Sequence, residues 1–150
     1  MIIRAFFFTL FFFLIAQPSF SETLSVKGDN VNLRSGPGVG FDIKWAYGNG
    51  FPLRVVERKG EWIKVRDFEK DTGWIHTSLL SGDSFVIVKS HKGTDKKINI
   101  RSGPSTRYDI VGKAFYGVVF RKLDSKSGWI KVRHESGLEG WIKETLMWQR

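Results

Sequence analysis

The sequence contains no cysteine, only three histidines and only four prolines among its 150 residues. Without cysteine the chain has no disulfide, no thiolate ligand for zinc, no thiol nucleophile and no N-terminal cysteine to which a lipid is attached. Small exported domains usually depend on disulfides or metals, so this chain must be stabilised by packing alone. An aromatic content of 15% supplies large side chains for that packing.

Long hydrophobic runs are also scarce, with one exception near the start of the chain. Residues 5–16 form an apolar stretch with a single polar member; Arg4 precedes it, Pro18 follows it, and small residues lie before the bond between Ser21 and Glu22. This pattern predicts a secretory signal peptide that is cleaved after Ser21. A membrane anchor is the alternative, but a helix of this length rises only about 18 Å against a hydrocarbon core of about 30 Å. We therefore expect an exported protein, in the periplasm or cell envelope, that does not span the membrane once mature.

The rest of the chain contains an internal repeat at a constant offset of 67 positions. Residues 32–37, Asn-Leu-Arg-Ser-Gly-Pro, return as residues 99–104, Asn-Ile-Arg-Ser-Gly-Pro. Residues 62–66, Trp-Ile-Lys-Val-Arg, return unchanged as residues 129–133, and a Gly-Trp-Ile tripeptide recurs at the same offset. Over the aligned span, 19 of 50 positions are identical. A constant offset over this length indicates two tandem copies of one domain.

Turn residues recur every eight to fifteen positions, and no segment carries a sustained helical period. Short β-type segments lie between the turns of the first copy, at residues 24–26, 31–33, 53–56, 62–66 and 74–75. This spacing predicts an all-β fold of two small barrels. We expect ten or more short strands, no helix longer than about two turns outside the signal peptide, and two separate cores.

Alternation along residues 62–66 assigns side chains to the two faces of a strand. Ile63 and Val65 point to one face, which we expect to be the core, and Trp62 points to the other. The tryptophans that follow glycine in Gly-Trp-Ile are also expected to fill the cores. The complete set of predicted core residues is Ile63, Val65, Trp74, Ile130, Val132 and Trp141.

The repeat divides the chain into a signal peptide, residues 1–21, a first domain, residues 22–80, a short linker, residues 81–84, and a second domain, residues 85–150. A polar linker of four residues predicts a restricted arrangement of the two domains. The charge is uneven, because residues 22–80 are nearly neutral whereas residues 81–150 carry a net charge of +7. Part of that charge lies on a loop that is longer in the second copy.

The repeated segments resemble the bacterial SH3 domain. Residues 32–37, followed by an aromatic residue and a carboxylate at Phe41 and Asp42, are similar to the opening of that domain. Residues 62–66 and the closing segment 73–80, Gly-Trp-Ile-His-Thr-Ser-Leu-Leu, are similar to the rest of it. The resemblance implies a small SH3-like β-barrel of five to seven short strands in each copy. It also implies export and binding of peptidoglycan or its peptides.

Arg34 and Arg101 occupy the same place in the two copies. Either could bind a carboxylate of a wall peptide, or each could shape its own loop. Because the position is shared by two otherwise divergent copies, a structural role is the favoured interpretation. Asp42 and Asp109 are likewise expected to cap backbone N–H groups rather than to form a catalytic pair.

No catalytic residue, metal site or cofactor is predicted. At the repeat offset His76 aligns with Lys143 and His134 aligns with Asp67, whereas His91 falls in the longer loop. The three imidazoles therefore share no common site, and no serine lies beside a base in a pattern that suggests nucleophilic catalysis.

Two kinds of function remain open. One is a non-catalytic module that binds a cell-wall peptide or glycan. The other is an adaptor that docks an extended or proline-rich segment of another envelope protein. The net charge of +9 favours an anionic partner such as the envelope surface, or serves solubility alone, while export argues against nucleic acid. The candidate ligand-binding residues are aromatic side chains and loop lysines, namely Phe41, Trp45, Trp62, Tyr108, Trp129, Lys92, Lys96 and Lys97.

Overall fold

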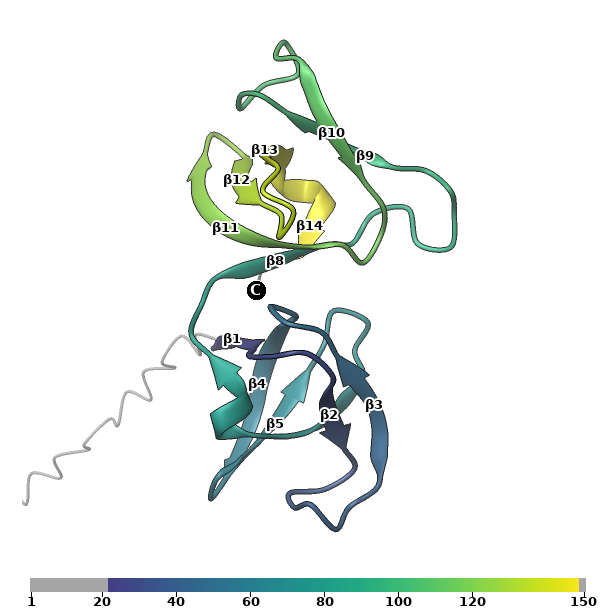
Figure 1. Cartoon of the computed structure of the whole chain (residues 1–150), viewed down its shortest axis with the longest axis vertical. Helices are drawn as coiled ribbons and strands as arrows, with labels where there is room; N and C mark the ends of the chain where they lie inside the picture. The colour runs from purple at the N-terminus through teal and green to yellow at the C-terminus, as the bar shows by residue number, and fades with distance from the viewer. Residues whose placement is uncertain (1–21, 149–150) are drawn as a thin grey trace, which may run out of the picture.

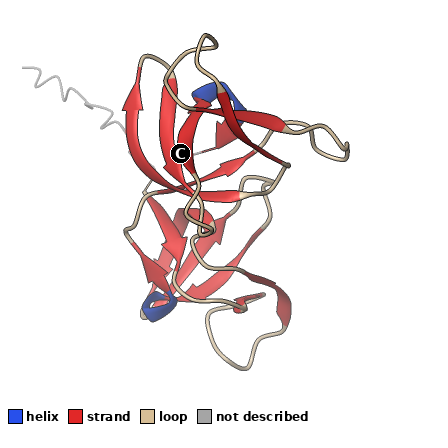
Figure 2. Cartoon of the chain, turned by 45° about the horizontal axis from the view of Figure 1, so that its top comes forward, coloured by secondary structure: helices blue, strands red, loops and turns tan. Residues whose placement is uncertain are grey.

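The computed structural model describes residues 22–148, which form two separate antiparallel sheets of seven strands each (Figure 1). The predicted signal peptide, residues 1–21, lies outside the described residues. Figure 2 shows strands, loops and two short helical turns in this part of the chain. The prediction of an all-β fold with ten or more short strands and two cores is confirmed. Within residues 22–148 no helix is both long and apolar enough to cross a bilayer.

The first sheet runs in the order β3-β2-β6-β5-β4-β1-β7. A single 3₁₀ turn, η1 (Thr77–Leu79), precedes its last strand. Its strands are β1 (Thr23–Val26), β2 (Val31–Arg34), β3 (Ile43–Tyr47), β4 (Pro52–Lys59), β5 (Trp62–Arg66), β6 (Thr72–His76) and β7 (Leu80–Ser81).

The second sheet repeats this topology, in the order β10-β9-β13-β12-β11-β8-β14. Its 3₁₀ turn is η2 (Glu144–Leu146). Its strands are β8 (Phe85–Val88), β9 (Ile98–Arg101), β10 (Ile110–Ala114), β11 (Val119–Lys126), β12 (Trp129–Arg133), β13 (Glu139–Lys143) and β14 (Met147–Trp148).

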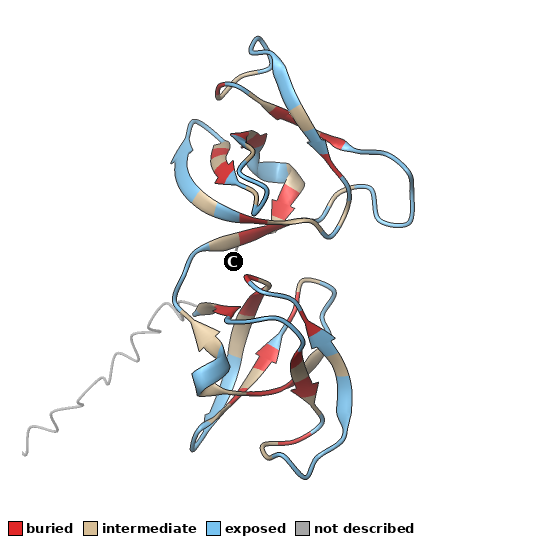
Figure 3. Ribbon diagram, in the orientation of Figure 1, coloured by how far each residue is buried: buried red, intermediate tan, exposed pale blue. Residues whose placement is uncertain are grey.

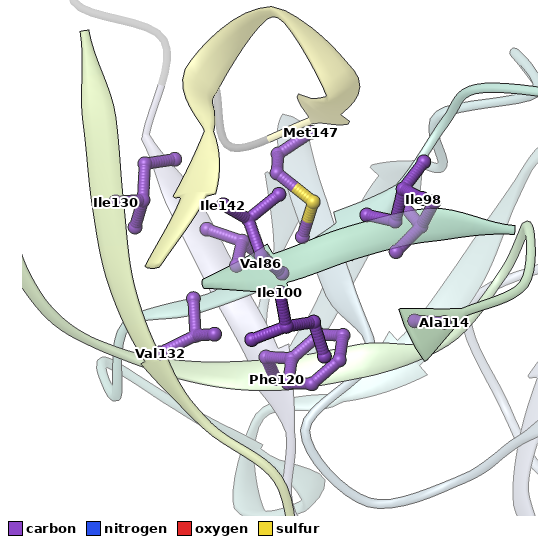
Figure 4. Close-up of a cluster of buried hydrophobic side chains, with 10 residues drawn as sticks. Val86, Ile98, Ile100, Ala114, Phe120, Ile130, Val132, Ile142 and Met147 are labelled. Carbon is purple, nitrogen blue, oxygen red and sulfur yellow. The ribbon is translucent and has the colours of Figure 1, made fainter. Parts of the chain in front are cut away.

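Buried residues occur along the strands of both sheets (Figure 3), and their hydrophobic side chains form one cluster in each domain. In the first domain the cluster includes Leu33, Leu53, Ile63, Val65 and Ile75. Figure 4 shows the second cluster, where β-branched residues from β8, β9, β12 and β13 meet Phe120 and Met147. The alternation prediction holds, because Ile63, Val65, Ile130 and Val132 are all at most 2% exposed.

The prediction that Trp74 and Trp141 are buried is confirmed for Trp74 and wrong for Trp141, and neither side chain belongs to a core cluster. Trp74 is only 8% exposed, yet the neighbour that joins the core cluster is Ile75, and side chains alternate along a strand. Trp74 instead lies opposite Lys64 across β5 and β6, with Lys64 Nζ 6.0 Å from the centre of its ring. Trp141 pairs with Lys131 in the same way and is half-buried. Both tryptophans cover the outer face of a sheet.

The linker is held against both domains. Ser25 Oγ donates a hydrogen bond to the carbonyl oxygen of Asp83 at 2.9 Å, and Lys122 N donates to the carbonyl oxygen of Ser84 at 2.8 Å. Asp83 Oδ1 also lies 3.5 Å from Arg121 Nη1. These contacts from two sides restrict the path of the chain between the sheets.

Candidate binding site

The loop after the repeated hexapeptide is organised by its arginine. Arg34 Nη1 donates hydrogen bonds of 2.9 Å to the carbonyl oxygens of both Val39 and Phe41. Arg101 Nη1 repeats this with Thr106 at 3.1 Å and Tyr108 at 2.8 Å. Each guanidinium therefore closes its own loop, which is the structural role that the shared position favours.

The predicted contact residues Phe41 and Tyr108 pack on the glycine of that hexapeptide. A Cβ atom built on Gly36 would lie 2.3 Å from the ring of Phe41, and one built on Gly103 would lie 2.5 Å from the ring of Tyr108. Only glycine leaves room for the ring at this point. Both rings remain partly exposed, since each residue is 48% exposed.

Trp62 lines a groove of about 370 Å³ on the first domain. Its ring meets that of His76 edge-on, with centroids 5.4 Å apart. His76 is held in turn, because its Nδ1 lies 2.8 Å from Ser78 Oγ and its Nε2 lies 3.6 Å from Glu61 Oε2. The other lining residues come from β2, the turn before it, the Arg34 loop and η1, and they are Asp29, Asn30, Val31, Asn32, Arg34, Val39, Ser78 and Leu79.

Trp129, at the equivalent place in the second domain, lines a different kind of groove. That groove has a volume of about 520 Å³ and is formed with Lys89, Lys143, Glu144 and Trp148 among others. Lys143 stands where the first domain has His76. The two tryptophans therefore belong to two separate grooves with different charge.

Trp45 and the loop lysines are not gathered at either groove. Trp45 is half-buried, packs against the first core and meets Tyr47 edge-on with centroids 6.4 Å apart. Lys92 Nζ lies 2.9 Å from Glu69 Oε1 in the first domain, and Lys97 Nζ lies 4.4 Å from the centre of the Phe115 ring. Lys96 is exposed on the longer loop. The structure thus brings Lys92 to the domain junction and leaves Lys96 as a surface charge.

Comparison with known proteins agrees with the division into two similar domains. A family model described as the bacterial SH3 domain matches residues 27–82, and a second model of the same description matches residues 96–147. Together they cover more than two thirds of the chain. The chain belongs to the bacterial SH3 domain family.

The relatives of these SH3 domains carry the names of cell-wall enzymes. YrvJ of Bacillus subtilis (strain 168), which bears the name of an N-acetylmuramoyl-L-alanine amidase, is 28% identical over 83% of this chain and 26% of its own length. LytH of Staphylococcus epidermidis (strain ATCC 12228 / FDA PCI 1200), which bears the name of a cell wall amidase, is 27% identical over 45% of this chain and 29% of its own length. The chain thus spans less than a third of either relative.

Among solved structures, the chain resembles an NlpC/P60 family protein from Bacillus cereus ATCC 10987. That match has a TM-score of 0.36 and 14% identity over 84% of this chain and 55% of the other. NlpC1 from Trichomonas vaginalis matches with a TM-score of 0.38 and 16% identity over 87% of this chain and 46% of the other.

The junction between the two SH3 domains is a feature that sequence reasoning missed. Phe68 and Glu69, in the turn between β5 and β6, contact Tyr116 of the second domain. The rings of Phe68 and Tyr116 have centroids 5.3 Å apart, and Tyr116 Oη donates a hydrogen bond to Glu69 Oε1. Lys92 joins the same carboxylate. These hydrogen bonds, with that from Tyr116 the larger cause, lower the pKa of Glu69.

The turn that carries these contacts is built on Asp67, which is 7% exposed. Its Oδ1 accepts hydrogen bonds of 2.9 Å from the backbone N–H groups of Glu69 and Asp71, and its Oδ2 accepts one of 3.0 Å from Tyr47 Oη. Burial raises the pKa of the Asp67 carboxyl in spite of these bonds. Tyr47 is itself a core residue whose pKa burial raises. Among residues 22–148 no group of three or more metal-ligating side chains is found.

Proposed function

We propose that the chain is a non-catalytic binding module of the cell envelope that holds peptidoglycan or its peptides in the Trp62 groove. The observation that carries this proposal is a half-buried tryptophan placed beside hydrogen-bonding groups in one groove. Aromatic faces suit the apolar faces of sugars and peptide side chains, and a few fixed polar groups orient such ligands. Arg34, Asn32 and Ser78 supply those groups here.

The names of the relatives support the cell wall as the place where the proposed binding occurs. Proteins that bear the names of cell-wall amidases contain stretches similar to these SH3 domains. The activity in those names belongs to proteins more than three times as long as the matched part. For this chain we propose binding without catalysis, in an exported protein whose two domains are residues 22–80 and 85–150, joined by residues 81–84, after removal of residues 1–21.

The test is retention of the predicted mature chain, residues 22–150, on purified peptidoglycan sacculi. The matched variants are Trp62→Ala and Trp129→Ala, which remove equivalent tryptophans from different grooves. We expect Trp62→Ala to weaken binding roughly tenfold or more, as truncation of a central aromatic contact does, and Trp129→Ala to weaken it less. Far-UV circular dichroism of both variants checks the fold. Equal retention of parent and Trp62→Ala, or no retention of the parent at low salt, would exclude this groove.

The adaptor alternative uses the same groove for an extended or proline-rich segment of an envelope protein. The observation that favours it is an exposed apolar side chain in the lining, Val39, which is 79% exposed, with Phe41 48% exposed in the same loop. Affinity purification from solubilised envelope separates the two functions. Wall fragments that co-elute support the first, and a stoichiometric protein partner that is lost in Trp62→Ala supports the second.

A further inference from the structure

Two arginines of the first domain lie directly opposite one another. Arg54 on β4 and Arg66 on β5 are paired in the antiparallel register. Like charges in this position repel each other and destabilise a sheet unless something compensates them. None of the ion pairs found within residues 22–148 includes Arg54, Arg66 or the nearby Lys70. The Nε atom of Arg54 is buried and has no hydrogen-bond partner in the same part of the chain.

These three cations line a small pocket at the domain junction. The pocket has a volume of about 210 Å³, and its other walls are Asp67, Phe68 and Trp148. Trp148 comes from the second domain, with its ring centre 5.8 Å from Arg54 Cζ. Asp67 also lines the pocket, but within residues 22–148 it forms no ion pair with Arg54, Arg66 or Lys70, and its oxygens accept hydrogen bonds from Tyr47 and from two backbone N–H groups.

The second domain contains the same pair in a neutralised form. Arg121 and Arg133, at the repeat offset, are again opposite one another. Arg121 lies 3.5 Å from Asp83, and Arg133 Nε donates a hydrogen bond of 2.5 Å to Glu139. Glu139 is opposite Arg133 across β12 and β13, whereas Thr72 is opposite Arg66 across β5 and β6. The first domain therefore lacks the carboxylate that the second domain provides for itself.

We infer that the junction pocket binds a small oxyanion, namely a terminal carboxylate or phosphate group of a ligand. This group would lie beside Arg66, as the carboxylate of Glu139 lies beside Arg133 in the second domain. Guanidinium groups match the planar or tetrahedral oxygens of such groups with paired N–H donors. Lys70 adds a third positive charge, and the rings of Phe68 and Trp148 form the apolar walls. The site is distinct from the Trp62 groove and stands whether or not that groove binds wall peptides. Because Trp148 belongs to the second domain, the site requires both domains.

The test uses isothermal titration calorimetry on residues 22–150 at low ionic strength with three probes. These are N-acetyl-alanyl-alanine, its C-terminal amide, and glycerol 3-phosphate. We expect at least one of the two anions to bind and the amide not to bind. Binding of the peptide acid alone assigns a carboxylate site, and binding of glycerol 3-phosphate alone assigns a phosphate site. Binding should also shift the indole N–H resonance of Trp148, which is assigned with Trp148→Phe.

Two variants and a matched control locate the site. Arg66→Gln should weaken binding roughly tenfold or more, because one charge-assisted hydrogen-bonding group is lost. Thr72→Glu should abolish binding by supplying an internal carboxylate to Arg66, and it should leave the fold intact, as Glu139 does in the second domain. Arg133→Gln is the control and should bind as the parent does. No binding of either anion by the parent, equal binding of the amide, or unchanged binding in both Arg66→Gln and Thr72→Glu would overturn the assignment.

Discussion

At the scale of the residue, Arg34 shows how one side chain determines the shape of a loop. Its guanidinium joins two carbonyl oxygens that are separated by one residue, and Arg101 does the same in the second domain. The loop thereby brings Val39 to the rim of the Trp62 groove and seats Phe41 on Gly36. A change at Arg34 should therefore affect both stability and the groove.

Arg34→Gln should lower the free energy of unfolding of the first domain by about 1–3 kcal/mol, because two carbonyl oxygens lose a charged donor. The measurement is urea denaturation followed by tryptophan fluorescence. Arg107→Gln is the control, since that side chain is exposed, and it should change stability by less than about 0.5 kcal/mol. A loss of the same size in both variants would show that Arg34 has no special role.

The sequence predicted the faces of single residues only where alternation was strict. Ile63 and Val65 were placed correctly because β5 alternates and is flanked on both sides. Trp74 was not, because its size and its glycine neighbour suggest a core position, whereas the register with Lys64 places it on the outer face. An aromatic side chain can be buried by the stem of a lysine, which no pattern of apolar residues reveals.

At the scale of the element, the close crossing of β2 and β6 limits what can stand at Gly73. A Cβ atom there would lie 2.5 Å from Leu33 Cγ and 2.8 Å from the carbonyl oxygen of Arg34, and Gly140 is enclosed in the same way by Ile100 and Arg101. The backbone oxygen cannot move aside without loss of the strand pairing. Glycine in the Gly-Trp-Ile tripeptide is thus a packing requirement.

Gly73→Ala should destabilise the first domain by about 1–3 kcal/mol through overpacking. Gly40→Ala is the matched control, because a Cβ atom on Gly40 meets nothing within 4 Å. Thermal unfolding of the two variants measures the difference. A melting temperature of Gly73→Ala that equals that of Gly40→Ala would show that β2 and β6 can move apart.

The sequence predicted most of the longer strands but missed the two-residue strands β7 and β14 and the longer strands β3 and β10. β3 and β10 are edge strands, and Ile43 and Ile110, at their starts, are 55% and 47% exposed. An edge strand with apolar residues toward solvent lacks the alternation on which the prediction depends. The junction was equally hidden, since Glu69 and Tyr116 are 47 positions apart and neither belongs to a repeated motif.

At the scale of the whole molecule, one carboxylate joins the two domains. Glu69 accepts a hydrogen bond from Tyr116 and lies 2.9 Å from Lys92. Phe68 in the same turn lies between Phe51 and Tyr116, so aromatic contacts continue from the first core to the second domain. The turn between β5 and β6 therefore connects the two domains through both polar and aromatic contacts.

Acid should break the contacts of Glu69 with Tyr116 and Lys92 and so loosen the domain junction. The pKa of Glu69 is lowered from its usual 4.5, so its contacts stabilise the junction above that value and are lost as pH falls through the lowered pKa. Asp67 titrates in the opposite sense, because burial raises its pKa and protonation relieves the cost of its charge. The measurement is the chemical shift of Tyr116 and the radius of gyration between pH 6 and pH 2. Glu69→Gln should show no such change in that range, and an identical pH response in this variant would assign the opening to another group.

The lysines of the longer loop should have two different roles, one at the domain junction and one in salt-dependent binding. Lys92→Gln should loosen the domain junction, because Lys92 pairs with Glu69. A double change of Lys96 and Lys97 to Gln should leave the junction intact and reduce the salt dependence of binding to sacculi, since exposed charges are screened over roughly 8 Å at physiological salt. Small-angle scattering tests the effect of Lys92→Gln on the junction. Binding to sacculi at increasing salt tests the double variant of Lys96 and Lys97. A double variant with the parent's salt slope would mean that these charges serve only solubility.

The identity of β5 and β12 has a consequence for how the chain refolds. The two strands have the same five residues, and each is central in its sheet. During refolding from denaturant, either strand fits the place of the other, and a tether of four residues keeps the competitor at high local concentration. Exchange of neighbouring similar segments is a characteristic error of tandem repeats. The kinetic partition between the native arrangement and the exchanged one then depends on the flanking residues that differ between the two copies, such as Thr72 and Glu139.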